Sequence, residues 1–178
     1  SPCDDLRCKN GAKCLTLYNW SGYYCKRRGR IIEEAVPWLK VSDERICFGA
    51  KDDSYGMFTI PWDGAVISIK LVYISGYVTC QKNRAPFGSH WGCDDPFTLL
   101  TYITNNRNEV IFPDRDGAAY TLPDYHANSP ELVFRTLREP EKVHAGVEFR
   151  IWYRQDRLDS SEDNNAGQTC AEVYVLMS

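Results

Sequence analysis

The chain has 178 residues, 43% hydrophobic and 13% aromatic, enough to bury a core in one domain with a small appendage. Its formal net charge is -3, with both signs spread along the chain, so nucleic acid and anionic membranes are not expected as partners. It contains neither an apolar signal core nor a run long enough to cross a bilayer, and because it starts at Ser1 we expect a mature or trimmed form.

Cysteines are frequent, and their number is even. The eight are Cys3, Cys8, Cys14, Cys25, Cys47, Cys80, Cys93 and Cys170. Such a set predicts a disulfide framework and therefore a secreted, extracellular protein. Because the sequence has no C-x-x-C pair and no closely spaced histidines, zinc is not expected.

Residues 1–25 hold four of the cysteines, with four, five and ten residues between successive ones. This spacing resembles the first half of an epidermal growth factor-like (EGF-like) module. The resemblance implies the disulfides Cys3–Cys14 and Cys8–Cys25. The fifth and sixth cysteines of such a module are absent, so we expect residues 1–30 to be a truncated EGF-like segment.

The region after this segment is expected to connect it to a larger domain. Lys26 to Arg30 are almost all basic, which leaves three alternatives: a solvated linker, a protease processing site, or a patch for sulfated polysaccharide. Residues 31–42 are expected to form a linker, with a helical turn that Pro37 would end. The sequon at Asn19 predicts N-glycosylation.

From residue 43 onward, short runs of β-branched and aromatic residues alternate with turn-forming residues, which predicts strands. The first three runs are 44–50, 55–60 and 65–80. Asp63-Gly64 predicts a hairpin between the second and third runs. Alternation in the third run places Ile67, Ile69 and Leu71 on one buried face.

Residues 81–96 are rich in Pro, Gly, Asn and Asp and predict a long loop, which a Cys80–Cys93 disulfide is well placed to close. That pairing would leave Cys47 for Cys170. Further strands are expected at 97–104, 109–113, 118–122, 131–137, 147–154 and 170–177. Because no helix-length segment separates them, we predict a mainly β fold over 43–178, an antiparallel two-sheet sandwich of the jelly-roll kind.

Several stretches of this domain resemble the uncharacterised skeletal organic matrix proteins of stony corals and related secreted cnidarian proteins. The most specific are AGVEFRIWYRQDRLDSSEDNN and GQTCAEVYVL, near the C-terminus. The resemblance implies a secreted or matrix-associated protein in which an EGF-like segment precedes this domain. It supplies no catalytic residues.

An acidic loop over 156–165 offers the densest set of oxygen ligands in the chain. Its members are Asp156, Asp159, Glu162, Asp163, Asn164 and Asn165. Calcium takes six to eight oxygen ligands, so this loop is a candidate calcium site, although it lacks the EF-hand spacing and is equally well explained as a solvated loop. The turn from Asp114 to Gly117 would complete a shared ion site if the fold brings it near, but ordinary turn chemistry explains it and Asp52-Asp53 as well.

The loop over 81–96 is a second candidate site. It contains His90, Trp91, Asp94 and Asp95, and an aromatic ring beside hydrogen-bonding side chains suits a sugar ring. The alternative is that Trp91 fills the core under the loop, as tryptophan commonly does.

No nucleophile elbow, Walker loop or H-E-x-x-H motif is present, so the protein is not expected to be an enzyme. We predict a secreted extracellular matrix or adhesion protein that binds calcium or mineral through its acidic loops. The alternative is a lectin-like carbohydrate-binding module, with or without calcium. Its partners would be matrix components or glycans. A receptor ligand acting through the N-terminal segment ranks last.

Overall fold

The computed structural model describes residues 13–16, 23–27, 30–32, 37–84, 88–93, 95–117 and 119–178, with the backbone alone for the first three ranges. Strands dominate these residues, and the only α-helix among them is the single turn α1 (Arg154–Arg157). None of the described helices has the length and apolar character needed to span a membrane. The predicted mainly β class is therefore confirmed.

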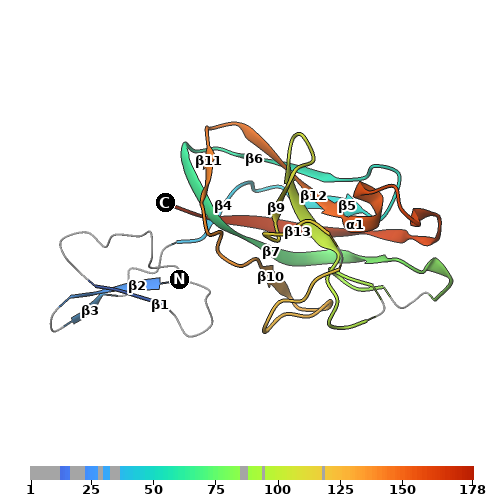
Figure 1. Ribbon diagram of the computed structural model, residues 1–178, viewed down its shortest axis with the longest axis horizontal. Coiled ribbons are helices and arrows are strands. Elements are labelled where there is room, and N and C mark those ends of the chain that lie inside the picture. Colours follow the sequence, from blue (N-terminus) through green and yellow to red (C-terminus); the bar gives the residue numbers. More distant parts are fainter. Residues whose placement is uncertain are drawn as a thin grey trace.

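Three short strands near the N-terminus form an antiparallel sheet of their own (Figure 1). They are β1 (Lys13–Thr16), β2 (Tyr23–Arg27) and β3 (Arg30–Ile32), in that order. Because β3 pairs with β2, the helical turn expected to begin at Ile31 is wrong there. Asn19 and the side chains of the first four cysteines lie outside the described residues, so the glycosylation and the two EGF-like disulfides stay predictions.

Two further antiparallel sheets form the main body, as the sandwich prediction requires (Figure 1). The first contains β10 (Glu131–Val133), β7 (Gly64–Thr79), β13 (Ala166–Met177) and β4 (Leu39–Lys40), with β11 (Glu141–Val143) on β7 and β5 (Ile46–Gly49) on β13. The second has the order β6 (Gly56–Ile60), β12 (Val147–Tyr153), β8 (Thr101–Asn105) and β9 (Val110–Phe112).

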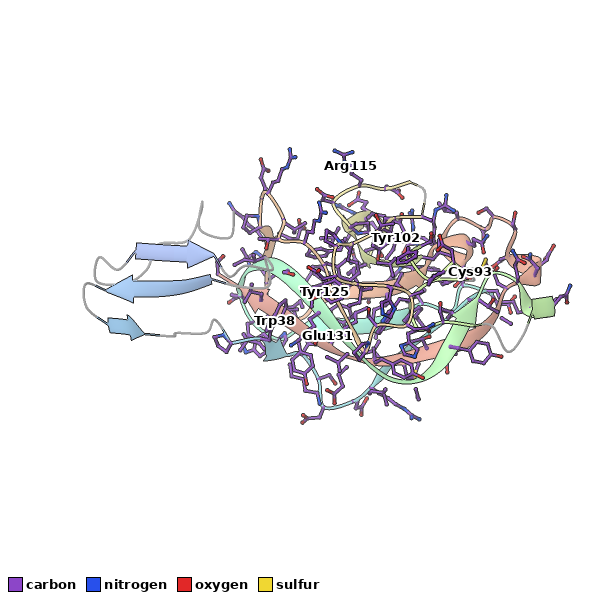
Figure 2. All side chains as sticks on the ribbon, turned by 90° about the horizontal axis from the view of Figure 1, so that it is seen from below. Trp38, Cys93, Tyr102, Arg115, Tyr125 and Glu131 are labelled. Atoms are coloured by element: carbon purple, nitrogen blue, oxygen red, sulfur yellow. A yellow bond between two sulfur atoms is a disulfide. The ribbon has the colours of Figure 1, made fainter. Side chains whose placement is uncertain are left out.

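Apolar side chains from both sheets fill the space between them (Figure 2). Ile69 and Leu71 of β7 belong to this core, as their alternation predicts. Ile67 is buried but is not part of the cluster, which contains Val66 instead, because the pairing of β7 with β13 shifts register at this point. From the second sheet, Phe149 meets Phe58 edge to face at 5.9 Å between ring centroids. One core therefore holds the two sheets together.

The predicted hairpin at Asp63-Gly64 is wrong. Strand β6 before it pairs with β12, whereas β7 after it pairs with β13, so the dipeptide turns the chain from one sheet into the other. Gly64 adopts a φ of +147°, which glycine tolerates and other residues avoid. Asp63 fastens this corner by accepting a hydrogen bond from the Ala145 N–H at 2.9 Å.

Two predicted features of the strand plan also differ in detail. Residues 119–122 make only isolated bridges, Leu99 with Tyr120 and Leu122 with Tyr125. Strand β4 lies within the expected linker and pairs with the end of β13, where Lys40 bonds to Glu172 at 2.7 Å. A two-residue strand has too short a pattern to be recognised in the sequence.

Both disulfides predicted for the main body are present. Cys47 and Cys170 lie opposite each other on β5 and β13, and their bridge spans 123 residues of sequence. Cys80 and Cys93 close the loop that follows β7. Covalent links thus fix the short strand β5 to the last strand, β13, and hold the base of the long loop.

Candidate functional site

The first predicted ligand of the acidic loop, Asp156, lies inside the protein. Its side chain is fully buried, and its two oxygens accept hydrogen bonds from the N–H groups of Asp53 at 2.8 Å and Ser54 at 2.9 Å. Glu162 accepts a weaker bond from the Asp52 N–H at 3.3 Å. These two carboxyl groups therefore hold the 52–54 turn against the acidic loop.

Burial raises the pKa of Asp156 to about 6, because removal from water disfavours the carboxylate. The two backbone N–H groups act in the opposite direction, and the neighbouring Glu162 raises the pKa further through a hydrogen bond and charge repulsion. At neutral pH the folded protein thus keeps a carboxylate in an unfavourable environment.

The remaining predicted ligands point elsewhere. Asp159 takes a left-handed backbone conformation on the exposed loop, and Asp163 and Asn164 lie exposed in a short 3-10 turn, where the Asp163 carbonyl accepts a bond from Lys82 at 2.7 Å. Asn165 is buried and donates to the Ala50 carbonyl at 2.8 Å. Among the described residues, no three His, Cys, Asp or Glu side chains are grouped closely enough to hold a metal ion. Calcium at this loop stays a prediction.

The fold does bring the turn from Asp114 to Gly117 near the acidic loop, but the contact between them is made by the guanidinium of Arg157. The Arg157 side chain, only 7% exposed, pairs with Asp116, and its guanidinium lies 5.5 Å from the centroid of the Tyr102 ring. Arg154 donates to the Gly117 carbonyl. The position proposed for a shared ion is thus taken by a cation of the chain itself.

Trp91 belongs to the core, the structural alternative of the two that the sequence left open. Its side chain is fully buried, and its Nε1 donates to the Ser129 carbonyl at 2.8 Å. A ring without exposed surface cannot support a sugar ring, so Trp91 is not a ligand-binding residue.

Its neighbours in the loop also serve local structure. His90 is half-buried and stacks on Tyr73 with 3.5 Å between ring centroids. Asp95 accepts hydrogen bonds from the Thr98 hydroxyl and the Phe97 N–H, which lower the pKa of its carboxyl. Asp94 lies outside the described residues. The predicted sugar site in this loop therefore lacks its aromatic surface.

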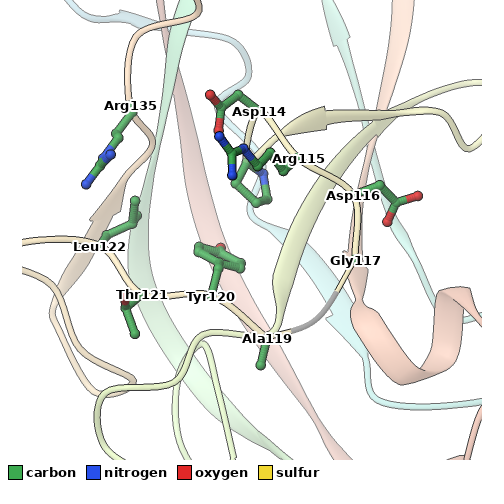
Figure 3. A pocket seen from close by; sticks show the side chains of 10 residues that line it. Asp114, Arg115, Asp116, Gly117, Ala119, Tyr120, Thr121, Leu122 and Arg135 are labelled. Atoms are coloured by element: carbon green, nitrogen blue, oxygen red, sulfur yellow. The ribbon is translucent and has the colours of Figure 1, made fainter.

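A better candidate is a concavity lined by other loops of the main body, which we name the first concavity (Figure 3). It has a volume of about 320 Å³ and is formed by residues 113–117 after β9, residues 119–122, and Arg135 after β10. This volume falls at the lower end of the range of about 300–1,000 Å³ for small-molecule sites. Arg115 and Arg135 line it with Tyr120 and Leu122.

Tyr120 gives this concavity a fixed aromatic wall. Its hydroxyl donates to the Thr101 carbonyl, and its ring lies 5.5 Å from Tyr102 and 6.4 Å from Phe134, measured between centroids. Burial raises the pKa of Tyr120 well above its ordinary value, so the phenol stays neutral. The sequence predicted an aromatic ring beside hydrogen-bonding side chains in the 81–96 loop. The structure has such an arrangement here instead, at Tyr120.

Sequence reasoning noted the Asp114 to Gly117 turn but missed Tyr120, Leu122 and Arg135. Arg135 lies about 20 residues beyond the turn, so only the folded chain brings them together. The available signal was an arginine that interrupts the apolar run ELVF-R-TL, where a buried strand would have continued.

Together these features define a disulfide-linked β-sandwich with a concave surface site that combines aromatic and charged groups. A similar chain exists among solved structures: AJLec from the sea anemone Anthopleura japonica, whose name marks it as a lectin. It is 29% identical, with a TM-score of 0.74, over 80% of this chain and 98% of that chain. No protein-family model matches the chain, and no curated protein does.

The neighbour is a cnidarian protein, which agrees in that broad respect with the resemblance drawn from the sequence. The comparisons do not place the chain among the coral skeletal matrix proteins. They also leave the EGF-like resemblance of the N-terminal segment untested.

Proposed function

We propose that this protein is an extracellular, lectin-like module that binds carbohydrate and carries out no catalysis. The observation that carries the proposal is the likeness to a sea anemone lectin, which extends over 98% of that lectin's chain and 80% of this one. The first concavity supports it, because a fixed aromatic ring beside hydrogen-bonding side chains is suited to a sugar. Two disulfides in the main body support an oxidising, extracellular location.

The predicted matrix role follows from this proposal if the bound glycans are those of the extracellular matrix. Whether binding requires calcium is a separate question, because a protein can bind sugar hydroxyls either through a metal ion or through side chains alone. Binding measured in calcium and again in chelator would answer it: loss in chelator would support an ion at the site, and unchanged binding would remove calcium from the proposal.

Filling the first concavity tests the proposed function. Arg135 is an exposed residue of its lining, and Figure 3 shows its side chain on the same side of the 119–122 segment as Tyr120 and Leu122. We expect Arg135→Trp to abolish capture of the protein by immobilised glycans, because the indole would occupy the space for the sugar. Thr59→Trp is the matched control, since Thr59 is exposed on β6 and is not part of the lining. A glycan array read with wild type and both variants provides the measurement. Failure of wild type to bind any glycan would overturn the proposal.

A further inference from the structure

The first concavity carries more positive charge than its composition suggests. Asp116 lies in its wall but is paired with Arg157, and Figure 3 shows its carboxylate pointing away from Tyr120. Arg115 and Arg135, both exposed, have no hydrogen bond or ion pair within the part of the chain that the structure describes. Two unneutralised guanidinium groups therefore face the concavity, against the single carboxylate of Asp114.

This local excess is notable on a chain whose formal net charge is -3. Arg115 reaches the surface of the body (Figure 2), and Arg135 is exposed as well, so both guanidinium groups remain hydrated until a ligand arrives. Guanidinium groups bind carboxylate and sulfate or phosphate oxygens with strong, charge-assisted hydrogen bonds. A neutral sugar would leave both of them without a countercharge.

A second concavity adjoins the first, and Asp114 and Arg115 line both. Its volume is about 540 Å³, and apart from the two shared residues its charged lining consists of two arginines, Arg107 and Arg138, and three glutamates, Glu109, Glu139 and Glu141. Arg107 pairs with Glu109 at 2.9 Å. Such a mixed surface offers donors and acceptors to hydroxyl groups without favouring an anion. The two concavities together are suited to a ligand of more than one ring, charged at one end.

We propose that the two concavities form one site for an acidic glycan chain. Arg115 and Arg135 hold an anionic group, sulfate or carboxylate, beside the ring of Tyr120, and the uncharged part of the chain lies along the second concavity. This inference rests on the proposed carbohydrate-binding function and names the chemical class of its ligand.

Titration calorimetry with three matched probes tests it: a chitin tetrasaccharide sulfated on its terminal residue, the same tetrasaccharide with a uronic acid as its terminal residue, and the unmodified neutral tetrasaccharide. We expect at least one acidic probe to bind about tenfold or more tighter than the neutral one, as charge-assisted hydrogen bonds should provide. Comparison of the two acidic probes separates sulfate from carboxylate. The preference should shrink as the ionic strength rises from about 0.1 M to 1 M, because exposed charges are then screened beyond about 3 Å.

Arg115→Gln and Arg135→Gln should each weaken binding of the preferred acidic probe about tenfold, a larger loss than either variant causes for the neutral probe. Arg45→Gln is the matched control: Arg45 is exposed and lies outside both linings, and its replacement removes the same charge. Since both test side chains are exposed, melting temperatures should match wild type.

Two results would overturn the inference while the proposed function stands. One is equal affinity for acidic and neutral probes; the other is glutamine variants of Arg115 and Arg135 that behave like Arg45→Gln although Arg135→Trp blocks binding. If wild type binds no glycan at all, the proposed function and the inference fail together.

Discussion

Replacing Cys47 and Cys170 together with alanine should lower the free energy of unfolding by about 4 to 5 kcal/mol. Their bridge closes a loop of 123 residues, and a closed loop of that length removes much of the freedom of the unfolded chain. The loss is a large fraction of the stability of an ordinary domain, about 5–15 kcal/mol. Equilibrium unfolding in urea at constant pH measures it.

The second bridge provides the control. Cys80 and Cys93 are separated by 13 residues, so their double alanine variant should lose about 3 kcal/mol, less than the first. An equal or larger loss for the short loop would show that loop closure is not what makes the Cys47–Cys170 bridge stabilising.

Replacing Asp156 with alanine should lower the free energy of unfolding by about 2 to 4 kcal/mol near pH 5, because the N–H groups of Asp53 and Ser54 would lose their buried acceptor. The measurement is again urea unfolding. Asp163→Ala is the control: its exposed side chain lies on the same loop, so its effect should stay within about 0.5 kcal/mol.

Asp156 also predicts a pH dependence with a definite sign. Its pKa is about 6 in the folded protein against 3.8 ordinarily, so between these values the folded state holds a proton that the unfolded state has released. Its contribution to stability is fully present below pH 3.8 and is lost as the pH rises through 6. Asp156→Ala should show a smaller decline over this interval than wild type. Parallel pH profiles would contradict the assignment.

The strand plan could be predicted because alternation is a local property. The pattern around Ile69 and Leu71 needs no knowledge of the partner strand, and Cys47 and Cys170 are paired once the short loop is closed. The Asp63-Gly64 error has a physical reason: the dipeptide favours a reversal of the chain, but it does not determine which sheet the next strand joins.

The site was harder to predict, because burial and proximity decide the role of a side chain. Trp91 and Tyr120 are both aromatic residues in loop regions, yet Trp91 is fully buried whereas Tyr120 lines the first concavity. Asp156 and Asp163 belong to one acidic run, but one is buried under the 52–54 turn and the other faces water. The sequence alone cannot tell the two members of such a pair apart, since both are aromatic in the first pair and both are aspartates in the second.

The placement of the Cys47–Cys170 bridge also determines how the protein would bear tension. Leu39 of β4 pairs with Val175, so pulling on the chain from both sides of the main body would peel this short pair apart one hydrogen bond at a time. The force would then pass directly through the two sulfur atoms. The chain between the two cysteines, which includes both concavities, would then lie outside the covalent path of the force.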